Sequence, residues 1–164
     1  MSIRPARMED AAALAAIYAP AVLHGTASFE VEAPSAADMA TRLMQVKSHG
    51  WPWLVHVTMG QVDGYAYASQ FRDRAAYRHC GECSVYVAPE AQRTGIGQAL
   101  LMAVVSVART AGFRQLVAVI GDSGNGNSIG LHTACGFERV GLLKDVGEKF
   151  GRPLDIVMMQ RSLV

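Results

Sequence analysis

Residues 92–97, with the sequence QRTGIG, combine the residue types of an anion-binding turn. They stand directly before the longest apolar helical pattern of the chain, so unpaired backbone N–H groups and the helix dipole would face an anion held there. Glycines at positions 95 and 97 would let the main chain approach a pyrophosphate closely, and the guanidinium of Arg93 suits phosphate oxygens. The pattern therefore predicts a diphosphate-binding turn, with a simple tight turn as the alternative.

Two better-known phosphate motifs do not fit these residues. A dinucleotide fingerprint requires a third glycine where Leu100 stands. A P-loop requires a Gly-Lys-Ser/Thr sequence, which the chain lacks. The diphosphate that we expect here therefore belongs to neither of these nucleotide-binding classes.

Glu82 and His132 are the residues whose chemistry suits proton transfer. Glu82 interrupts an otherwise apolar strand pattern at residues 81–87, where a carboxylate is costly unless it has a partner or a function. An ion pair with Arg72, Arg74 or Arg78 is the alternative to a catalytic role. His132 titrates near neutral pH and could accept or donate a proton, whereas a packing role is the alternative.

Two cysteines, Cys80 and Cys83, form a C-x-x-C pattern with His79 alongside, which could indicate a zinc or redox site. In a strand, positions 80 and 83 point to opposite faces, and the chain offers no second pair of ligands. We therefore expect no metal. Cys135, before a helix-ending glycine, is expected to be a small packing residue.

Residues 71–79 concentrate positive charge with aromatic side chains after a predicted strand. A guanidinium presents paired donors, which recognise a carboxylate, phosphinate or sulfone oxygen. The segment therefore predicts contacts to an oxygen-bearing acceptor, with a solvated basic loop as the alternative.

Periodicity and turn residues predict the elements that must position these groups. The expected strands cover residues 2–6, 53–59, 62–71, 81–87, 115–120, 137–142 and 154–160. The expected helices cover residues 11–22, 36–49, 96–111 and 128–135, with Ser35 and Asp38 forming a capping box at the second. This order predicts an α/β fold in which helices cover both faces of one sheet.

Composition limits the classes of function. At 164 residues and 17.6 kDa the chain predicts a single domain, residues 1–164. A net charge of +1 disfavours nucleic acid as a partner, and the uncharged helical stretch at residues 98–108 is too short to span a membrane. Charged residues near the start disfavour a secretory signal, and three cysteines indicate reduced thiols, so we expect a cytoplasmic protein.

The sequence resembles the GNAT N-acetyltransferases. The segments VYVAPEAQRTGIGQALL and N-x-x-S-I-x-L-H-x-x-x-G-F resemble their coenzyme-A core, and GECSVYV, SIGLHTACGF and VGEKFGRPLDIVMMQ resemble the branch that acetylates phosphinothricin or methionine sulfone and sulfoximine. The resemblance covers nearly the whole chain. It implies the GNAT fold, a mixed and mostly antiparallel sheet with a splayed central strand pair and helices on both faces.

The resemblance also implies the co-substrate and the residues that bind it. Acetyl-CoA would lie between the strand at residues 85–87 and the strand at residues 115–120. The implied cofactor-binding residues are Val85, Tyr86, Val87, Arg93, Thr94, Gly95, Ile96, Gly97, Gln98 and Asn125. By the same resemblance, Glu82 takes the amine proton, His132 serves the departing thiolate, and the Val87 N–H stabilises the oxyanion.

The acceptor implied by the resemblance is the α-amine of a small amino-acid analogue, attacked directly in a ternary complex. The implied substrate-binding residues are Phe29, Glu30, Arg72, Arg74 and Tyr77. Phe71 and Pro153 stand where relatives often carry tryptophan, which puts the shape of the acceptor pocket in doubt. Acetylation of a protein N-terminus or another amine, and a non-catalytic acyl-CoA-binding regulator, are the alternatives. The chain is 51% hydrophobic and 18% charged, and the resemblance implies that part of this apolar excess pairs two subunits as a homodimer.

Overall fold

Seven strands form one sheet in the computed structural model, which describes residues 1–164. The strands are β1 (Ser2–Pro5), β2 (Trp53–Thr58), β3 (Gln61–Gln70), β4 (Cys80–Val87), β5 (Gln115–Gly121), β6 (Glu138–Lys149) and β7 (Arg152–Ser162). They lie in the order β1-β2-β3-β4-β5-β7-β6. All neighbours pair antiparallel except β4 and β5, which are parallel. The mostly antiparallel α/β sheet predicted for the chain is confirmed.

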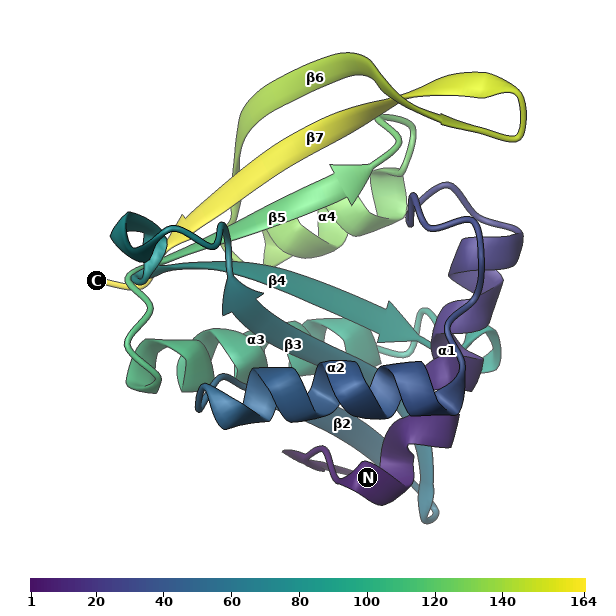
Figure 1. Cartoon of the computed structure of the whole chain (residues 1–164), viewed down its shortest axis with the longest axis vertical. Coiled ribbons are helices and arrows are strands. Elements are labelled where there is room, and N and C mark those ends of the chain that lie inside the picture. Colours follow the sequence, from purple (N-terminus) through teal and green to yellow (C-terminus); the bar gives the residue numbers. More distant parts are fainter.

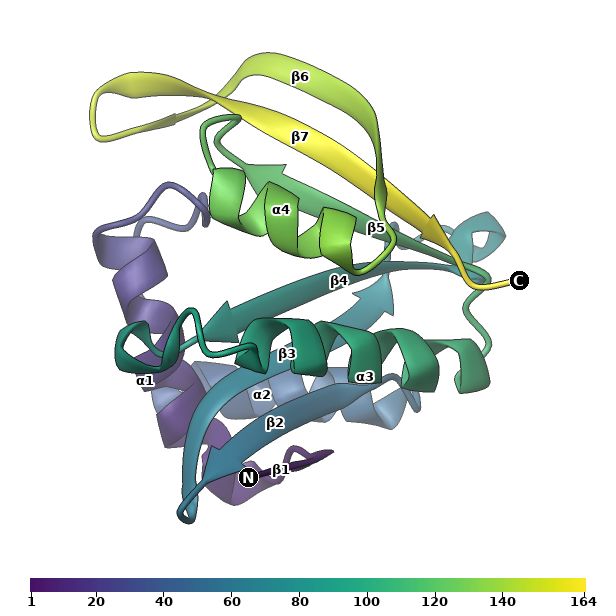
Figure 2. The same cartoon turned by 180° about the vertical axis from the view of Figure 1, so that it is seen from behind.

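Four helices cover the two faces of this sheet. They are α1 (Ala11–Leu23), α2 (Ala36–Ser48), α3 (Ile96–Thr110) and α4 (Gly126–Ala134). Figure 1 shows α2 in front of β2 and β3, and Figure 2, from behind, shows α3 and α4 across the opposite face. Each face has its own apolar core: Leu14, Leu43 and Val55 are buried on the α1 and α2 face, and Leu100 and Leu116 on the α3 face.

Local sequence explains where the helices that border the site begin. The Ser35 side chain accepts a hydrogen bond from the Asp38 N–H at 3.1 Å, and the Asp38 carboxylate accepts one from the Ser35 N–H at 2.8 Å. This is the predicted capping box, and it fixes the start of α2. At α3, Gly95 takes the left-handed conformation with φ of +88°, which a residue with a side chain rarely adopts.

The central strands β4 and β5 separate soon after they meet. Only residues 80–82 of β4 pair with residues 115–117 of β5, and the rest of β4 has no partner on that side. Figure 1 shows the two strands diverging toward α1. The predicted splayed pair is confirmed, and it leaves a wedge-shaped gap in the middle of the sheet.

The last hairpin is longer than the sequence predicted. The strand expected at residues 137–142 extends as β6 to Lys149, with irregular pairing between Leu143 and Gly147. Exposed charged residues in this stretch, among them Lys144 and Asp145, hide the alternation on which strand prediction depends. The helix expected to begin at Ser128 begins two residues earlier, because the Asn125 side chain caps its first turn.

Candidate active site

The backbone of β4 alternates between its two neighbours, and this decides which groups face the gap. Just after β4, the Ala88 N–H donates to the Asp63 carbonyl of β3, at 2.9 Å. Since backbone groups alternate along a strand, the N–H groups of Val85 and Val87 point the other way, toward β5. Strand β5 no longer pairs with β4 there, so both N–H groups face the gap.

Side chains of β4 alternate in the same way. Glu82 lies opposite Ser69 on β3, and Ser84 lies opposite Tyr67, so these four side chains share the face that α2 covers. Cys83 points to the other face and belongs to the core beneath α3. The carboxylate that the sequence predicts as a base therefore stands on the α2 face.

Glu82 is partly buried beside one cation. Its side chain is 34% exposed, and its Oε2 lies 3.9 Å from the Arg72 Nη1. Burial raises the pKa of Glu82 above the ordinary carboxyl value, and the Arg72 charge opposes that rise. The arrangement contains the ion pair considered from the sequence, but the distance is long and Arg72 is largely exposed. Glu82 can therefore exchange a proton with a group that approaches from the α2 face.

His132 lies on α4, on the opposite face. Its Nδ1 is 2.8 Å from the Ser128 carbonyl oxygen, and its Nε2 is buried without any hydrogen-bond partner. A carbonyl only accepts, so the Nδ1 carries the proton and the Nε2 presents a free lone pair. Burial lowers the pKa of His132, which favours this neutral form.

A cavity of about 60 Å³ lies at the gap, between residues of β4, β5 and α4. Its lining includes Ser84 and Tyr86 from the α2 face of β4, and Cys83 from the other face. The α4 segment adds Asn125 and His132. His132 therefore reaches the gap from one face of the sheet, while Glu82 stands on the other.

The turn at residues 92–97 has the geometry that the sequence predicts for an anion site. Arg93 and Gly95 both take positive φ angles, +63° and +88°. A Cβ added at Gly97 would lie 3.3 Å from Leu131 Cδ2 and 3.6 Å from Val87 Cγ2, so only glycine leaves this end of the gap open. The first N–H groups of α3 have no partner within the helix. These features fit a diphosphate.

The other predicted cofactor residues differ in what they can offer. Ile96 is buried in the α3 core and Tyr86 packs edge-on against Tyr18 at 4.7 Å, so each offers mainly its main chain. The Thr94 hydroxyl donates to the Ala91 carbonyl at 2.6 Å. Gln98 is exposed on the first turn of α3.

Asn125 has a structural task at the same position. Its Oδ1 accepts a hydrogen bond from the Ser128 N–H at 3.2 Å, which caps α4. The side-chain NH₂ group makes no hydrogen bond within the protein. The residue therefore caps α4 and keeps its amide donors available, and its role in binding the cofactor stays a prediction.

The connection between α1 and α2 contributes the predicted residues Phe29 and Glu30. Both oxygens of Glu30 bind Arg42, at 2.5 Å and 3.0 Å, and the Tyr18 hydroxyl also donates to this carboxylate. The Phe29 ring packs against Gly121 and Gly147, where a Cβ would collide with it. The structure thus brings this connection to the end of the gap and fixes it to β5 and β6.

The predicted basic loop lies after β3. The Arg72 guanidinium stacks over the Phe71 ring, 4.1 Å from its centroid, and Tyr77 packs edge-on against the same ring at 6.0 Å. Arg74 is exposed, and its carbonyl accepts a bond from Gln70 Nε2 at 3.0 Å. Of the loop's three predicted residues, the structure brings only Arg72 next to Glu82.

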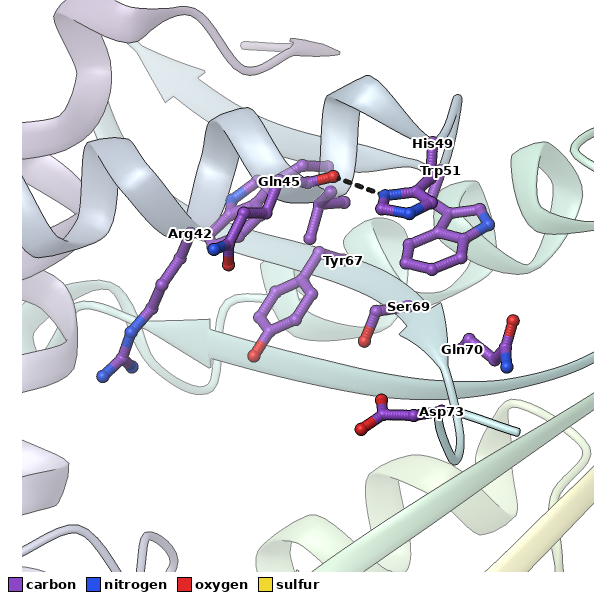
Figure 3. Close-up of a pocket in the computed structure, with 10 residues that line it drawn as sticks. Arg42, Gln45, His49, Trp51, Tyr67, Ser69, Gln70 and Asp73 are labelled. Carbon is purple, nitrogen blue, oxygen red and sulfur yellow. Dashed lines mark hydrogen bonds between the residues drawn. The ribbon is translucent and has the colours of Figure 1, made fainter. Parts of the chain in front are cut away.

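Sequence reasoning missed a cavity of about 520 Å³ between α2 and β3. Figure 3 shows that α2 supplies Arg42 and Gln45, that His49 follows directly after α2, and that β3 and the following loop supply Tyr67, Ser69, Gln70 and Asp73. Trp51, Trp53 and Val46 complete the lining. The alternation of Tyr65 and Tyr67 along β3 placed both on one face, but the sequence did not show which helix covers them.

Other candidate chemistry finds no support in the geometry. Cys80 is partly exposed and Cys83 is buried, and both are free thiols. No three His, Cys, Asp or Glu side chains lie together as a metal-ion site would require. No helix has the length and apolar character needed to cross a bilayer.

A splayed β4–β5 pair followed by an anion-binding turn is the arrangement that the resemblance implied. A family model described as an acetyltransferase (GNAT) domain matches residues 3–158. The chain belongs to the GNAT acetyltransferase family. It is an N-acetyltransferase, as its curated relatives are.

Three relatives show the place of this GNAT chain in the family. It is 48% identical to the phosphinothricin N-acetyltransferase of Alcaligenes faecalis, over 99% of this chain and 82% of the relative. It is 40% identical to an L-methionine sulfoximine/L-methionine sulfone acetyltransferase of Pseudomonas aeruginosa, over 99% and 94%. A solved phosphinothricin acetyltransferase from Sinorhizobium meliloti, in complex with AcCoA, superposes with a TM-score of 0.94 at 45% identity, over 98% and 87%.

These likenesses confirm the GNAT fold and the resemblance to the phosphinothricin and methionine sulfone branch. They do not test the role of any single residue. The assignments of Glu82, His132 and the binding residues stay predictions, to which the geometry adds the positions described above.

Proposed function

We propose that the chain transfers an acetyl group from acetyl-CoA to the α-amine of a small amino-acid analogue of the phosphinothricin or methionine sulfone and sulfoximine type. Transfer is direct, within a ternary complex. The relatives that carry these names span nearly the whole chain and support the choice of acceptor. The observation that carries the proposal is the Arg72–Glu82 pair, which stands beside the gap on the α2 face.

This pair matches the head group of an α-amino acid. Such a head group holds an ammonium and a carboxylate on one carbon, so its receptor needs an anion and a cation a few ångströms apart. The Glu82 Oε2 and the Arg72 Nη1 are 3.9 Å apart, and both side chains retain access to solvent. In the proposed complex Glu82 receives the ammonium and Arg72 receives the carboxylate.

The gap and the turn at residues 92–97 offer a seat for acetyl-CoA, which supplies the acetyl group as a thioester. The N–H groups of the turn and the first turn of α3 would hold its pyrophosphate. The main chain of Val85 and Val87 would bind its pantetheine arm as a strand binds a strand, with Asn125 donating its amide. The Val87 N–H also suits a developing oxyanion, because it faces the gap without a partner.

Proton transfer is divided between the two faces. An amine attacks only when neutral, and Glu82 is the group placed to take its proton. His132 enters with the proton on Nδ1 and a lone pair on Nε2. It is therefore a hydrogen-bond acceptor in the gap, and it can donate to a leaving group only after a proton has reached Nε2.

Three further expectations remain part of the proposal. One domain, residues 1–164, carries both the acetyl-CoA seat and the acceptor site. The free thiols of Cys80, Cys83 and Cys135 support a reducing compartment, the cytoplasm.

The expected partners are a second copy of the chain and a small-molecule amine, rather than nucleic acid or a membrane. Exposed apolar side chains along edge strand β6, including Val140 and Leu143, support the homodimer.

The test is an assay of free-thiol release from acetyl-CoA. The panel contains phosphinothricin, methionine sulfone, methionine sulfoximine, the common amino acids and short peptides. The proposal expects thiol release with the amino-acid analogues and little release with peptides. Binding of acetyl-CoA without thiol release across the panel would favour a regulatory module instead.

A further inference from the structure

The 520 Å³ cavity between α2 and β3 has no assigned role. It directly adjoins the proposed base, because Ser69 in its wall is the cross-strand partner of Glu82 and Tyr67 is the partner of Ser84. Its size is in the range of cavities that hold small molecules, which is about 300–1,000 Å³. Figure 3 shows its walls, with α2 on one side and β3 on the other.

An acceptor held by its head group at Glu82 and Arg72 has few directions for its side chain. The gap between β4 and β5 is the seat of the other substrate. The α1–α2 connection is fixed by Phe29 against Gly121 and Gly147. The cavity next to Ser69 offers open volume on the α2 face, beside the cross-strand partner of Glu82.

The charges around this cavity disfavour an anion. Arg42 lines it, but both of its terminal nitrogens bind the two oxygens of Glu30, so its charge is already neutralised. Asp73 also lines the cavity and forms no ion pair. Arg74 does not belong to the lining.

The cavity instead offers uncharged donors and aromatic walls. Trp53 is 3% exposed, and its Nε1–H has no hydrogen-bond partner in the protein. Its ring stacks on Tyr67 at 4.2 Å, and His49 stacks on Trp51 at the same distance. Neutral N–H and O–H donors satisfy a neutral oxygen, and aromatic faces suit the apolar stem that carries it.

We propose that this cavity is the subsite for the acceptor's side chain, and that Asp73 makes it select an uncharged oxygen-bearing side chain over an anionic one. The inference rests on the proposed function and narrows its substrate class. Of the acceptors considered above, methionine sulfone and methionine sulfoximine carry uncharged side chains, and phosphinothricin carries the anionic phosphinate; methionine sulfone serves as the uncharged probe. The chain therefore prefers methionine sulfone, although its identity to a phosphinothricin acetyltransferase is higher.

The first experiment compares kcat/KM for the two acceptors in the wild type, in Asp73→Asn and in Glu9→Gln, an exposed acid outside the cavity. The wild type is expected to favour methionine sulfone. Because like charges brought together oppose binding, Asp73→Asn should raise the phosphinothricin-to-sulfone ratio about tenfold through KM, and Glu9→Gln should not change it. A wild type that favours phosphinothricin, or an unchanged ratio in Asp73→Asn, would overturn the charge selection.

The second experiment tests the location of the subsite. Gln45→Trp fills the cavity from α2, whereas Met44→Trp places the same bulk on the neighbouring exposed position outside the lining. Gln45→Trp should raise KM for methionine sulfone about tenfold and leave KM for acetyl-CoA unchanged. Met44→Trp should change neither value. An unaltered acceptor KM in Gln45→Trp would place the side chain elsewhere.

The two proposals can fail separately. Absence of thiol release with every amino acid in the wild type would reject the proposed function. Calorimetric titration of methionine sulfone and phosphinothricin into the CoA-loaded protein measures the subsite without turnover. Weaker sulfone binding in Gln45→Trp than in Met44→Trp supports the subsite, and equal binding rejects it.

Discussion

The two faces of the β4–β5 gap differ in what they present to a reacting molecule. On the α2 face, Glu82 stands beside Arg72 and a cavity of about 520 Å³. On the α4 face, His132 is buried, packs edge-on against Phe137 at 5.1 Å, and borders a space of about 60 Å³. One face offers a large cavity and compensating charge, whereas the other offers a small space and a buried, neutral imidazole.

The same physical cause acts on both titratable groups with opposite results. Burial disfavours the charged form, so it raises the pKa of Glu82 and lowers the pKa of His132. Only Glu82 has a cation nearby, and this cation, Arg72, partly offsets the rise in its pKa. The difference teaches that the α2 face keeps a paired carboxylate that can take a proton, whereas the α4 face holds a neutral imidazole.

Glu82→Gln should have the largest effect of any change at the gap. It keeps the shape of the side chain but removes the proton acceptor from the α2 face, so kcat should fall by roughly 10²–10⁴. The affinity for acetyl-CoA should stay the same, because the seat at residues 92–97 is untouched. Steady-state thiol release and calorimetry measure the two quantities, and undiminished turnover would remove Glu82 from the base assignment.

Gly97→Val should act on the gap itself rather than on either face. A Cβ there already lies 3.3 Å from Leu131, so two further methyl groups would crowd the seat and weaken acetyl-CoA binding about 10- to 100-fold. Gly130→Val on α4 is the matched control, because a Cβ at Gly130 meets no atom within 4 Å. Equal acetyl-CoA affinities in the two variants, by calorimetry, would contradict the assignment of the turn.

His132→Gln should have a smaller effect, because a group that only accepts a hydrogen bond contributes less than the base. We expect kcat to fall about tenfold, with KM for the acceptor unchanged since the acceptor enters from the other face. A fall in kcat as large as that of Glu82→Gln would contradict this account, because the α4 face would then supply a proton-transfer group as important as Glu82.

Arg72→Gln should produce the smallest change in kcat at high pH, a higher KM for the acceptor because its carboxylate loses a partner, and a shift in the pH profile. A base must be ionised, so kcat/KM rises as pH passes through the pKa of Glu82, which burial holds above 4.5. Arg72 lowers that pKa, so its removal should move the rising limb to higher pH. The pH profile of thiol release measures this shift. A rising limb that stays at the same pH, or moves to lower pH, would show that Arg72 does not lower the pKa of Glu82.

Much of the fold was predictable because local signals agree with it. The capping residues Ser35 and Asp38 mark the start of α2, and Gly95 marks the start of α3. The turn at residues 92–97 and the carboxylate at Glu82 also stand out from their own sequence surroundings. Strand β6 was predicted too short because its exposed charges hide the period of the strand.

The arrangement of the site was less predictable because it depends on packing between distant segments. The sequence assigned catalytic roles to Glu82 and His132 together, but strand alternation and helix docking place them on opposite faces of the sheet. The Arg42–Glu30 pair joins α2 to the α1–α2 connection, and the unpartnered Trp53 N–H lies buried on β2. No local pattern reports such contacts.

The most direct test of the division between the faces is a structure of the protein with CoA and methionine sulfone bound together. The account predicts the amine of the sulfone within hydrogen-bond distance of Glu82, its carboxylate on Arg72, and its side chain between α2 and β3. It places CoA in the gap, with its pyrophosphate on the turn at residues 92–97. An acceptor bound on the α4 face beside His132, with the cavity near Ser69 empty, would contradict it.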